Sequence, residues 1–238
     1  MTFVDGDFVK IEYSAWRTAD NALLSTTNEQ LAKENGTYDE KAKYRPQLVV
    51  IGKHDVIKGV ENAIRNMSPN EEKKIDIEPK DAFGERDPSL VKVVALSDFR
   101  KRDIEPYPGM HIDVDGTEAV VKSVNSGRVV IDENNELAGE KLTYSLKVVE
   151  KIDKDEDKIK AIAERLDLEP KAVKLDGATA HVELGDTSKN ADYEARKSML
   201  PSYIFAYMQN INKVEITDTY VREAQTQSSQ QQKQQKQS

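Results

Sequence analysis

Residues 49–64, with the sequence VVIGKHDVIKGVENAI, constrain the fold more than any other stretch of the chain. The β-branched start predicts a short buried strand that ends at Gly52. Apolar residues recur at helical spacing in the second half of the stretch, which predicts a short helix with one apolar face. Because Ser68-Pro69 cannot continue a helix, we expect this one to end near Asn66.

The first turn of this helix is a candidate binding site. Backbone N–H groups in a first turn have no partner within the helix. Here such a group lies beside Val56 and Ile57, so a hydrogen-bond donor adjoins apolar side chains. A site of this kind can hold a substrate carbonyl without a catalytic acid or base. The same pattern is also typical of an ordinary strand–turn–helix unit in a core, and periodicity alone leaves both interpretations open.

The composition excludes several classes of function. The 238 residues carry a net charge of −8, which argues against a broad nucleic-acid-binding surface. The chain has no cysteine, which excludes disulfides, thiolate metal sites and cysteine nucleophiles. No apolar run approaches the roughly 20 residues of a membrane span, and the first residues lack the features of a signal peptide. We therefore expect a cytoplasmic protein that is not embedded in a membrane.

The periodic patterns predict a first domain interrupted by an insert. Strand patterns and the 49–64 stretch assign residues 1–89 and 133–152 to one domain. Residues 90–132 between them read as a strand, a loop and three short strands. The turn signals Asp115-Gly116 and Ser126-Gly127 join those short strands as hairpins. The insert is therefore predicted to be a small β unit.

The C-terminal part of the chain predicts a second domain and a tail. Residues 153–224 read as a helix, two strands, a helix and a strand, with Pro201 as a kink or restart of the second helix. From residue 225 onwards the chain has no apolar residue, which predicts a disordered tail.

The sequence predicts neither a metal site nor a cofactor. His54, His111 and His181 lie in three different predicted units, so a cluster formed by them is not expected. No phosphate-binding, dinucleotide-binding or hydrolase motif is present.

Four stretches in the same order carry a resemblance to a known family. They are VKIEYSAWRTADNALLSTT near the start, residues 49–64, PKDAFGERD after the helix, and ELAGEKLTYSLKVVEKI near residue 150. Together they resemble the FKBP-type peptidyl-prolyl cis-trans isomerases. The insert resembles the insert-in-flap domain of SlyD-like members, and the extra C-terminal domain resembles archaeal long-type members.

The resemblance implies an α+β fold, with an antiparallel curved FKBP half-barrel sheet around the short helix. It also implies a small inserted β domain and a C-terminal αββαβ domain. The implied activity is rotation of X–Pro bonds in an apolar aromatic pocket without a cofactor. The implied substrates are unfolded or partly folded proline-containing polypeptides, and the insert would add chaperone activity.

The resemblance assigns pocket residues one by one. The catalytic set is Tyr13, Leu24, Val56, Ile57, Val60, Phe83 and Tyr144, with the Ile57 N–H as the carbonyl donor. The substrate-binding set is Ser25 and Val49 near the pocket and Leu96, Phe99, Tyr107 and Met110 in the insert. Ser25 stands where the family usually has Asp, which predicts weakened macrolide binding.

A second class of function remains open. The insert could bind unfolded segments in a holdase-type chaperone or interaction scaffold without significant isomerase activity. The C-terminal domain could mediate self-association or bind a partner, which the sequence does not name.

Overall fold

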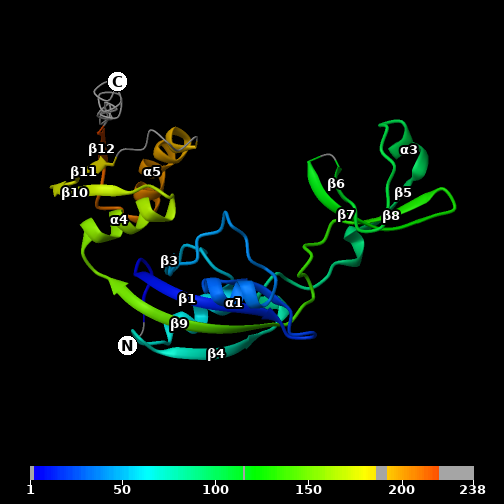
Figure 1. Cartoon of the computed structure of the whole chain (residues 1–238), viewed down its shortest axis with the longest axis horizontal. Coiled ribbons are helices and arrows are strands. Elements are labelled where there is room, and N and C mark those ends of the chain that lie inside the picture. Colours follow the sequence, from blue (N-terminus) through cyan, green and yellow to red (C-terminus); the bar gives the residue numbers. More distant parts are fainter. Residues whose placement is uncertain (1–2, 115, 186–191, 220–238) are drawn as a thin grey trace, which may run out of the picture. The chain divides into compact units, whose positions relative to one another are not determined.

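The computed structural model describes residues 3–114, 116–185 and 192–219. It divides into two compact units, Met1–Lys151 and Ile152–Ser238. Figure 1 traces the elements of both units along the chain.

A five-stranded sheet forms the base of the first unit. Its strands are β1 (Phe8–Arg17), β2 (Leu23–Thr26), β3 (Gln47–Val50), β4 (Glu72–Ile77) and β9 (Leu142–Ile152). The order is β2-β1-β9-β4, and β3 pairs with the first half of β1. The β1–β2, β1–β3 and β4–β9 pairs are antiparallel. The order places β9, from the far side of the insert, between β1 and β4 (Figure 1).

The helix α2 (Lys58–Arg65) packs against this sheet and ends beside Asn66, as predicted. Its apolar face contributes Val60 and Ile64 to a core that also contains buried side chains of β1, β3, β4 and β9. The approach to β4 is close at Gly59, where a Cβ atom would lie 2.4 Å from the Ile77 side chain. Glycine at this position therefore lets the helix sit directly on the sheet.

We expect Gly59→Ala to lower the free energy of unfolding by about 1–3 kcal/mol, because overpacking displaces neighbouring atoms. Alanine is more favourable than glycine in a helix by up to about 1 kcal/mol. A loss of stability would therefore show that the clash with Ile77 outweighs this gain in helix propensity. Urea unfolding of Gly59→Ala, Ile77→Ala and the double variant measures this contact. In the double variant the two effects should be less than additive. Additive losses would contradict a clash at Ile77.

Three short helical segments lie in connections of the first unit. They are α1 (Glu29–Glu34), η1 (Pro79–Asp81) and η2 (Pro88–Leu90). Asn28 caps α1, because its side-chain oxygen accepts the Leu31 N–H at 3.0 Å. This helix lies in the polar connection between β2 and β3.

The insert has its own sheet and its own core. Its elements are β5 (Val91–Ala95), α3 (Leu96–Arg100), β6 (His111–Val114), β7 (Thr117–Asn125) and β8 (Arg128–Asp132). The strand order is β5-β8-β7-β6. The buried side chains are Phe99, Ile112, Ala119, Val121, Val129 and Ile131. The sequence predicts a strand to Leu96 and then a loop, but Leu96 begins α3, which carries Phe99 into the core. Asp115, in a predicted turn, lies outside the described residues.

The second unit contains two helices and a three-stranded sheet among its described residues. The elements are α4 (Asp155–Arg165), β10 (Pro170–Asp176), β11 (Thr179–Leu184), α5 (Tyr193–Tyr207) and β12 (Lys213–Asp218). β12 is parallel to β11, and β10 is antiparallel to it. α5 continues through Pro201, so of the two predicted alternatives, a kink or a restart, the restart does not occur. The predicted disordered tail lies outside the part of the chain that the structure describes.

The predicted α+β class is confirmed, with antiparallel pairs in the sheets of the first unit and a parallel pair, β11–β12, in the second. Within the described ranges, none of the helices combines the length and apolarity that crossing a bilayer requires.

Candidate active site

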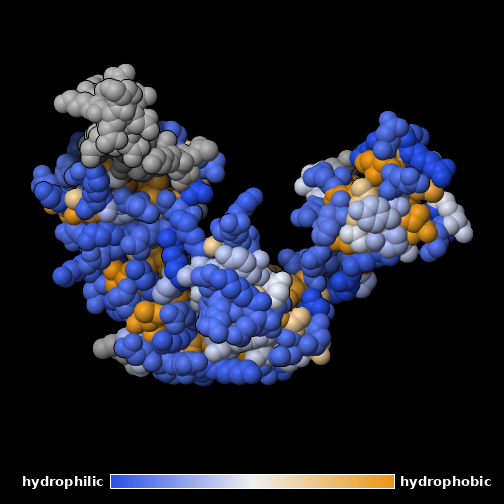
Figure 2. Space-filling view, viewed as in Figure 1, coloured by the Kyte–Doolittle hydropathy of each residue, from blue (hydrophilic) through white to orange (hydrophobic). Residues whose placement is uncertain are grey.

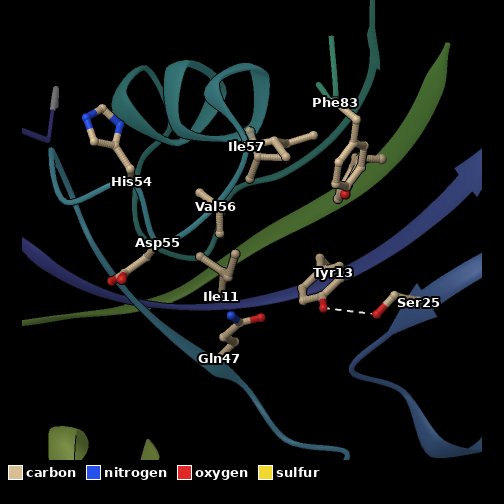
Figure 3. A pocket seen from close by; sticks show the side chains of 11 residues that line it. Ile11, Tyr13, Ser25, Gln47, His54, Asp55, Val56, Ile57 and Phe83 are labelled. Carbon is tan, nitrogen blue, oxygen red and sulfur yellow. Dashed lines mark hydrogen bonds between the residues drawn. The ribbon is translucent and has the colours of Figure 1, made fainter. Parts of the chain in front are cut away.

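A pocket of about 570 Å³ opens beside the N-terminal end of α2. It is lined by Ile11, Tyr13, Ser25, Gln47, His54, Asp55, Val56, Ile57, Val60, Phe83 and Tyr144. Most of the predicted pocket residues therefore meet in one place, although they come from β1, β2, α2, β9 and two loops. Figure 3 shows Ile57 at the start of α2, between Val56 and Phe83. The volume lies in the range typical of small-ligand sites.

Two tyrosines form the aromatic wall of the pocket. The rings of Tyr13 and Tyr144 are stacked, with centroids 6.1 Å apart and an interplanar angle of 29°. Burial, and to a smaller extent the neighbouring Tyr13, raise the pKa of Tyr144 to about 12. Its hydroxyl is therefore neutral throughout the physiological pH range. Since no hydrogen bond to this hydroxyl is found among the described residues, Tyr144 contributes mainly its ring.

A backbone donor adjoins the apolar wall. Ile57 is the N-cap of α2, and its φ of −60° and ψ of 151° place it outside the helix. Within the described chain, the N–H of Ile57 has no hydrogen-bond partner, whereas its carbonyl accepts the Glu61 N–H at 3.0 Å. A polar donor next to Val56 and Phe83 is thus available to a ligand carbonyl.

Two carboxylates hold the turn that precedes this donor. Asp55 Oδ2 accepts the Val50 N–H at 2.9 Å, and Glu61 Oε1 accepts the Gly52 N–H at 3.2 Å. Glu61 is 7% exposed and also binds Arg65 Nη2 at 2.7 Å. The turn that carries Val56 and Ile57 is therefore fixed from both ends, as a preformed site requires.

The pocket also contains Ile11, Gln47, His54 and Asp55, and Glu61 supports it, although local sequence patterns do not indicate these residues. Their contributions depend on tertiary neighbours. The one signal for Glu61 in the sequence is a glutamate beside the apolar face of a helix, with Arg65 one turn later.

Ser25 lies in the pocket, where its Oγ is 3.1 Å from the Tyr13 hydroxyl (Figure 3). Leu24 and Val49 do not line the pocket, contrary to expectation. Successive strand residues point to opposite faces, so β2 cannot direct both Leu24 and Ser25 inward. Val49 is completely buried in the core beneath the site.

The residues predicted to bind substrate in the insert have different environments. Leu96 lines a second cavity of about 380 Å³, together with Arg100, Asp103, Ile104, Glu105, Pro106 and Val124. Phe99 is buried in the core of the insert, and Met110 packs against that core. Tyr107 is 62% exposed and is free to contact another chain.

The histidines remain apart. His54 lines the pocket, His111 lies between Glu118 and Glu136, and His181 is 2.8 Å from Glu215. Among the described residues, no group of His, Asp and Glu side chains is arranged to hold a metal ion.

Models of known families match two parts of the chain. The family model described as FKBP-type peptidyl-prolyl cis-trans isomerase matches residues 1–98. A second model, described as FKBP26, IF domain, matches residues 92–137, which include most of the insert.

Individual proteins also match the chain. The chain is 35% identical over 143 residues to the short-type peptidyl-prolyl cis-trans isomerase of Methanocaldococcus jannaschii, covering 60% of this chain and 90% of that protein. It is 26% identical to the isomerase SlyD of Pasteurella multocida, covering 56% and 68% respectively. It is 25% identical to the FKBP-type 16 kDa isomerase of Escherichia coli, covering 50% and 85%. The chain therefore belongs to the FKBP-type peptidyl-prolyl cis-trans isomerases and resembles their SlyD-like members.

Proposed function

We propose that the pocket catalyses X–Pro rotation by binding the twisted peptide bond in dry, apolar surroundings. Rotation must overcome a barrier of roughly 18–20 kcal/mol, because it breaks the resonance of the peptide bond. The twisted state has less charge separation than the planar one, so an apolar pocket favours it. X–Pro bonds are suitable substrates because their cis and trans forms differ little in energy.

The observation that carries this proposal is the free Ile57 N–H at an apolar wall. We assign the proline ring to the space bounded by Val56, Val60, Phe83 and Tyr144, which lies beside this donor. The donor would hold a substrate carbonyl while the ring is enclosed. No nucleophile or proton transfer is required.

Replacing Ile57 by proline tests the donor directly. Proline has no N–H, and its φ of about −65° matches the −60° observed at Ile57. Since a neutral hydrogen bond contributes about 0.5–1.5 kcal/mol, we expect kcat/KM on a short X–Pro peptide to fall roughly 2- to 12-fold.

The matched control is Ile57→Ala, which shortens the side chain but keeps the N–H. We expect Ile57→Pro to show the larger loss in kcat/KM at an equal folded fraction. Equal losses in the two variants would reject the role of the donor. A wild-type protein that accelerates no X–Pro substrate would reject the proposed pocket mechanism altogether.

We further propose that the insert binds unfolded segments and supplies chaperone activity. Figure 2 shows apolar side chains (orange) at the surface of the insert. Exposed Tyr107 and the cavity beside Leu96 support a weak binding surface for apolar segments. Tyr107 is not part of the core of the insert, whereas Leu96, Ile104 and Val124 at the cavity also pack against that core.

Exposed Tyr107 and the cavity beside Leu96 also support a second candidate function for the insert, that of a holdase. A holdase suppresses aggregation even when its isomerase pocket is inactive. An aggregation assay with a Phe83→Ala variant separates the two activities. Unchanged suppression with a reduced isomerisation rate would show that holding does not require an active pocket.

Ser25 should lower the affinity for macrolide inhibitors relative to relatives with Asp. Hydrogen bonds to a charged group contribute about 1.5–3 kcal/mol, against about 0.5–1.5 kcal/mol for neutral ones. We therefore expect Ser25→Asp to bind a macrolide roughly five- to tenfold more tightly, with little change in kcat/KM. Inhibitor titration measures the change in affinity. Ser25→Asn is the neutral control, because its side chain has the same shape as that of Asp. Equal affinity of the Asp and Asn variants would contradict the charge argument.

Other features of the chain remain proposals. Met199 and Phe205 on α5 are each 44% exposed, which supports self-association or partner binding by the second unit. Sedimentation of the full chain and of residues 1–152 would test this.

We propose that the chain divides into four parts. They are an isomerase domain of residues 1–89 and 133–152, the insert of residues 90–132, a C-terminal domain of residues 153–224 and a tail from residue 225. Limited proteolysis should first cleave near residue 153 and in the tail. The cytoplasmic location stays a prediction from the sequence.

A further inference from the structure

Two short segments connect the main sheet to the insert, and they are joined to each other by polar contacts. The segments are residues 84–90 and 133–140. The Gly139 N–H donates to the Gly84 carbonyl at 2.8 Å, and the Glu133 N–H donates to the Leu90 carbonyl at 3.0 Å. Gly84 directly follows Phe83 of the pocket, so the line of contacts begins at the pocket wall.

The Asn134 side chain links the two segments both as a hydrogen-bond acceptor and as a donor. Its Oδ1 accepts the Asp87 N–H at 2.8 Å, and its Nδ2 donates to the Asp87 carbonyl at 2.9 Å. A side-chain amide thus replaces the backbone pairing of two strands. The same Nδ2 also donates to Asp132 Oδ1 at 2.8 Å.

Asp132 supplies a buried charge at the end of β8. It is 2% exposed, and its second carboxylate oxygen pairs with Arg86 of the other segment. Lys122 is 3.7 Å from the same oxygen. A buried carboxylate is costly unless it is paired, so this arrangement resists separation of the segments. We call Arg86, Asp87, Asp132 and Asn134 the hinge network.

We infer that Arg86, Asp132 and Asn134 are positioning residues for polypeptide substrates, a role that rests on the proposed binding of unfolded chains by the insert. By joining the connecting segments, they restrict the movement of the insert relative to the pocket. A chain bound on the insert then meets the pocket at a high effective concentration, which falls as a tether becomes looser. A short peptide that enters the pocket directly does not depend on the network.

The test uses the full chain with Asn134→Ala and its neighbour Asn135→Ala as the matched control. Asn135 Oδ1 accepts the Leu137 N–H at 2.9 Å, within its own segment, so its loss leaves the cross-links intact. A second variant, Asp132→Asn, keeps the acceptor for Asn134 and removes the charge that faces Arg86. Each variant is assayed on an X–Pro peptide and on a protein whose refolding is limited by proline isomerisation.

A distance measurement accompanies the kinetics. Because the chain has no cysteine, Asn62→Cys and Glu118→Cys introduce two labelling sites, one on α2 and one in the insert. Both positions are exposed. Pulsed electron spin resonance on the doubly labelled chain then reports the distribution of their separation.

We expect Asn134→Ala and Asp132→Asn to broaden this distribution and to slow catalysed refolding at least fivefold. Peptide catalysis should change less than twofold, and Asn135→Ala should behave as the wild type. An unchanged distribution, or equal losses on both substrates, overturns the inference. A chain without the insert that retains full refolding activity rejects the binding role and the inference with it. In another outcome, deletion of the insert selectively lowers refolding activity while Asn134→Ala and Asp132→Asn have no effect. That outcome rejects the role of the hinge network and leaves the binding role of the insert intact.

Discussion

Removal of residues 90–132 is expected to abolish most catalysis of protein refolding and to spare catalysis on short peptides. All the residues that line the pocket lie outside the deleted segment. The ends of the deletion are neighbours, because Val91 pairs with Asp132 at the edge of the insert sheet. A short turn can therefore close the gap without moving β9. The fold of the pocket should survive.

The expected loss on a protein substrate is about 100-fold, the low end of what a second linked binding site provides. Refolding limited by proline isomerisation, compared with peptide isomerisation at the same enzyme concentration, measures the difference. A milder variant, Tyr107→Ser, alters an exposed side chain and should lower refolding activity by a smaller factor without unfolding the insert. Equal losses on peptide and protein substrates would exclude a binding role for the insert.

Truncation of Tyr144 should have the largest effect on the pocket itself. Tyr144→Ala removes the ring that stacks on Tyr13 and opens the wall to water. If the ring contributes about 2 kcal/mol of contact with the twisted substrate, kcat/KM falls roughly 30-fold. The free energy of unfolding should also fall, by at most about 3 kcal/mol, because Tyr144 is only partly buried against the core. Peptide kinetics at an equal folded fraction separates the two effects.

Tyr144→Phe is the matched control for this prediction. The hydroxyl has no hydrogen-bond partner among the residues described, so its removal leaves no buried group unpaired. We expect activity and stability close to those of the wild type. A large loss in Tyr144→Phe would assign a direct role to the hydroxyl, and full activity in Tyr144→Ala would exclude the aromatic wall.

The sequence alone determined the local elements around the site. The run of apolar residues at 49–64 specified a strand, a turn and α2, because side-chain period and turn chemistry act over a few neighbours. It also placed Val56, Ile57 and Val60 together, since one short helix and its preceding turn carry them all. The order of four family stretches gave the α+β class and the distant partners Tyr13, Phe83 and Tyr144.

Tertiary structure decided which faces of these elements meet. Ser25 and not Leu24 lines the pocket, because the pairing of β2 with β1 sets which residues point inward. Glu61 supports the pocket turn only because Gly52 is folded back onto α2. Asp132 reads as the polar end of a strand, yet it is buried against Arg86, 46 positions earlier in the chain. Such pairings depend on strand register and chain reversal, which local composition does not encode.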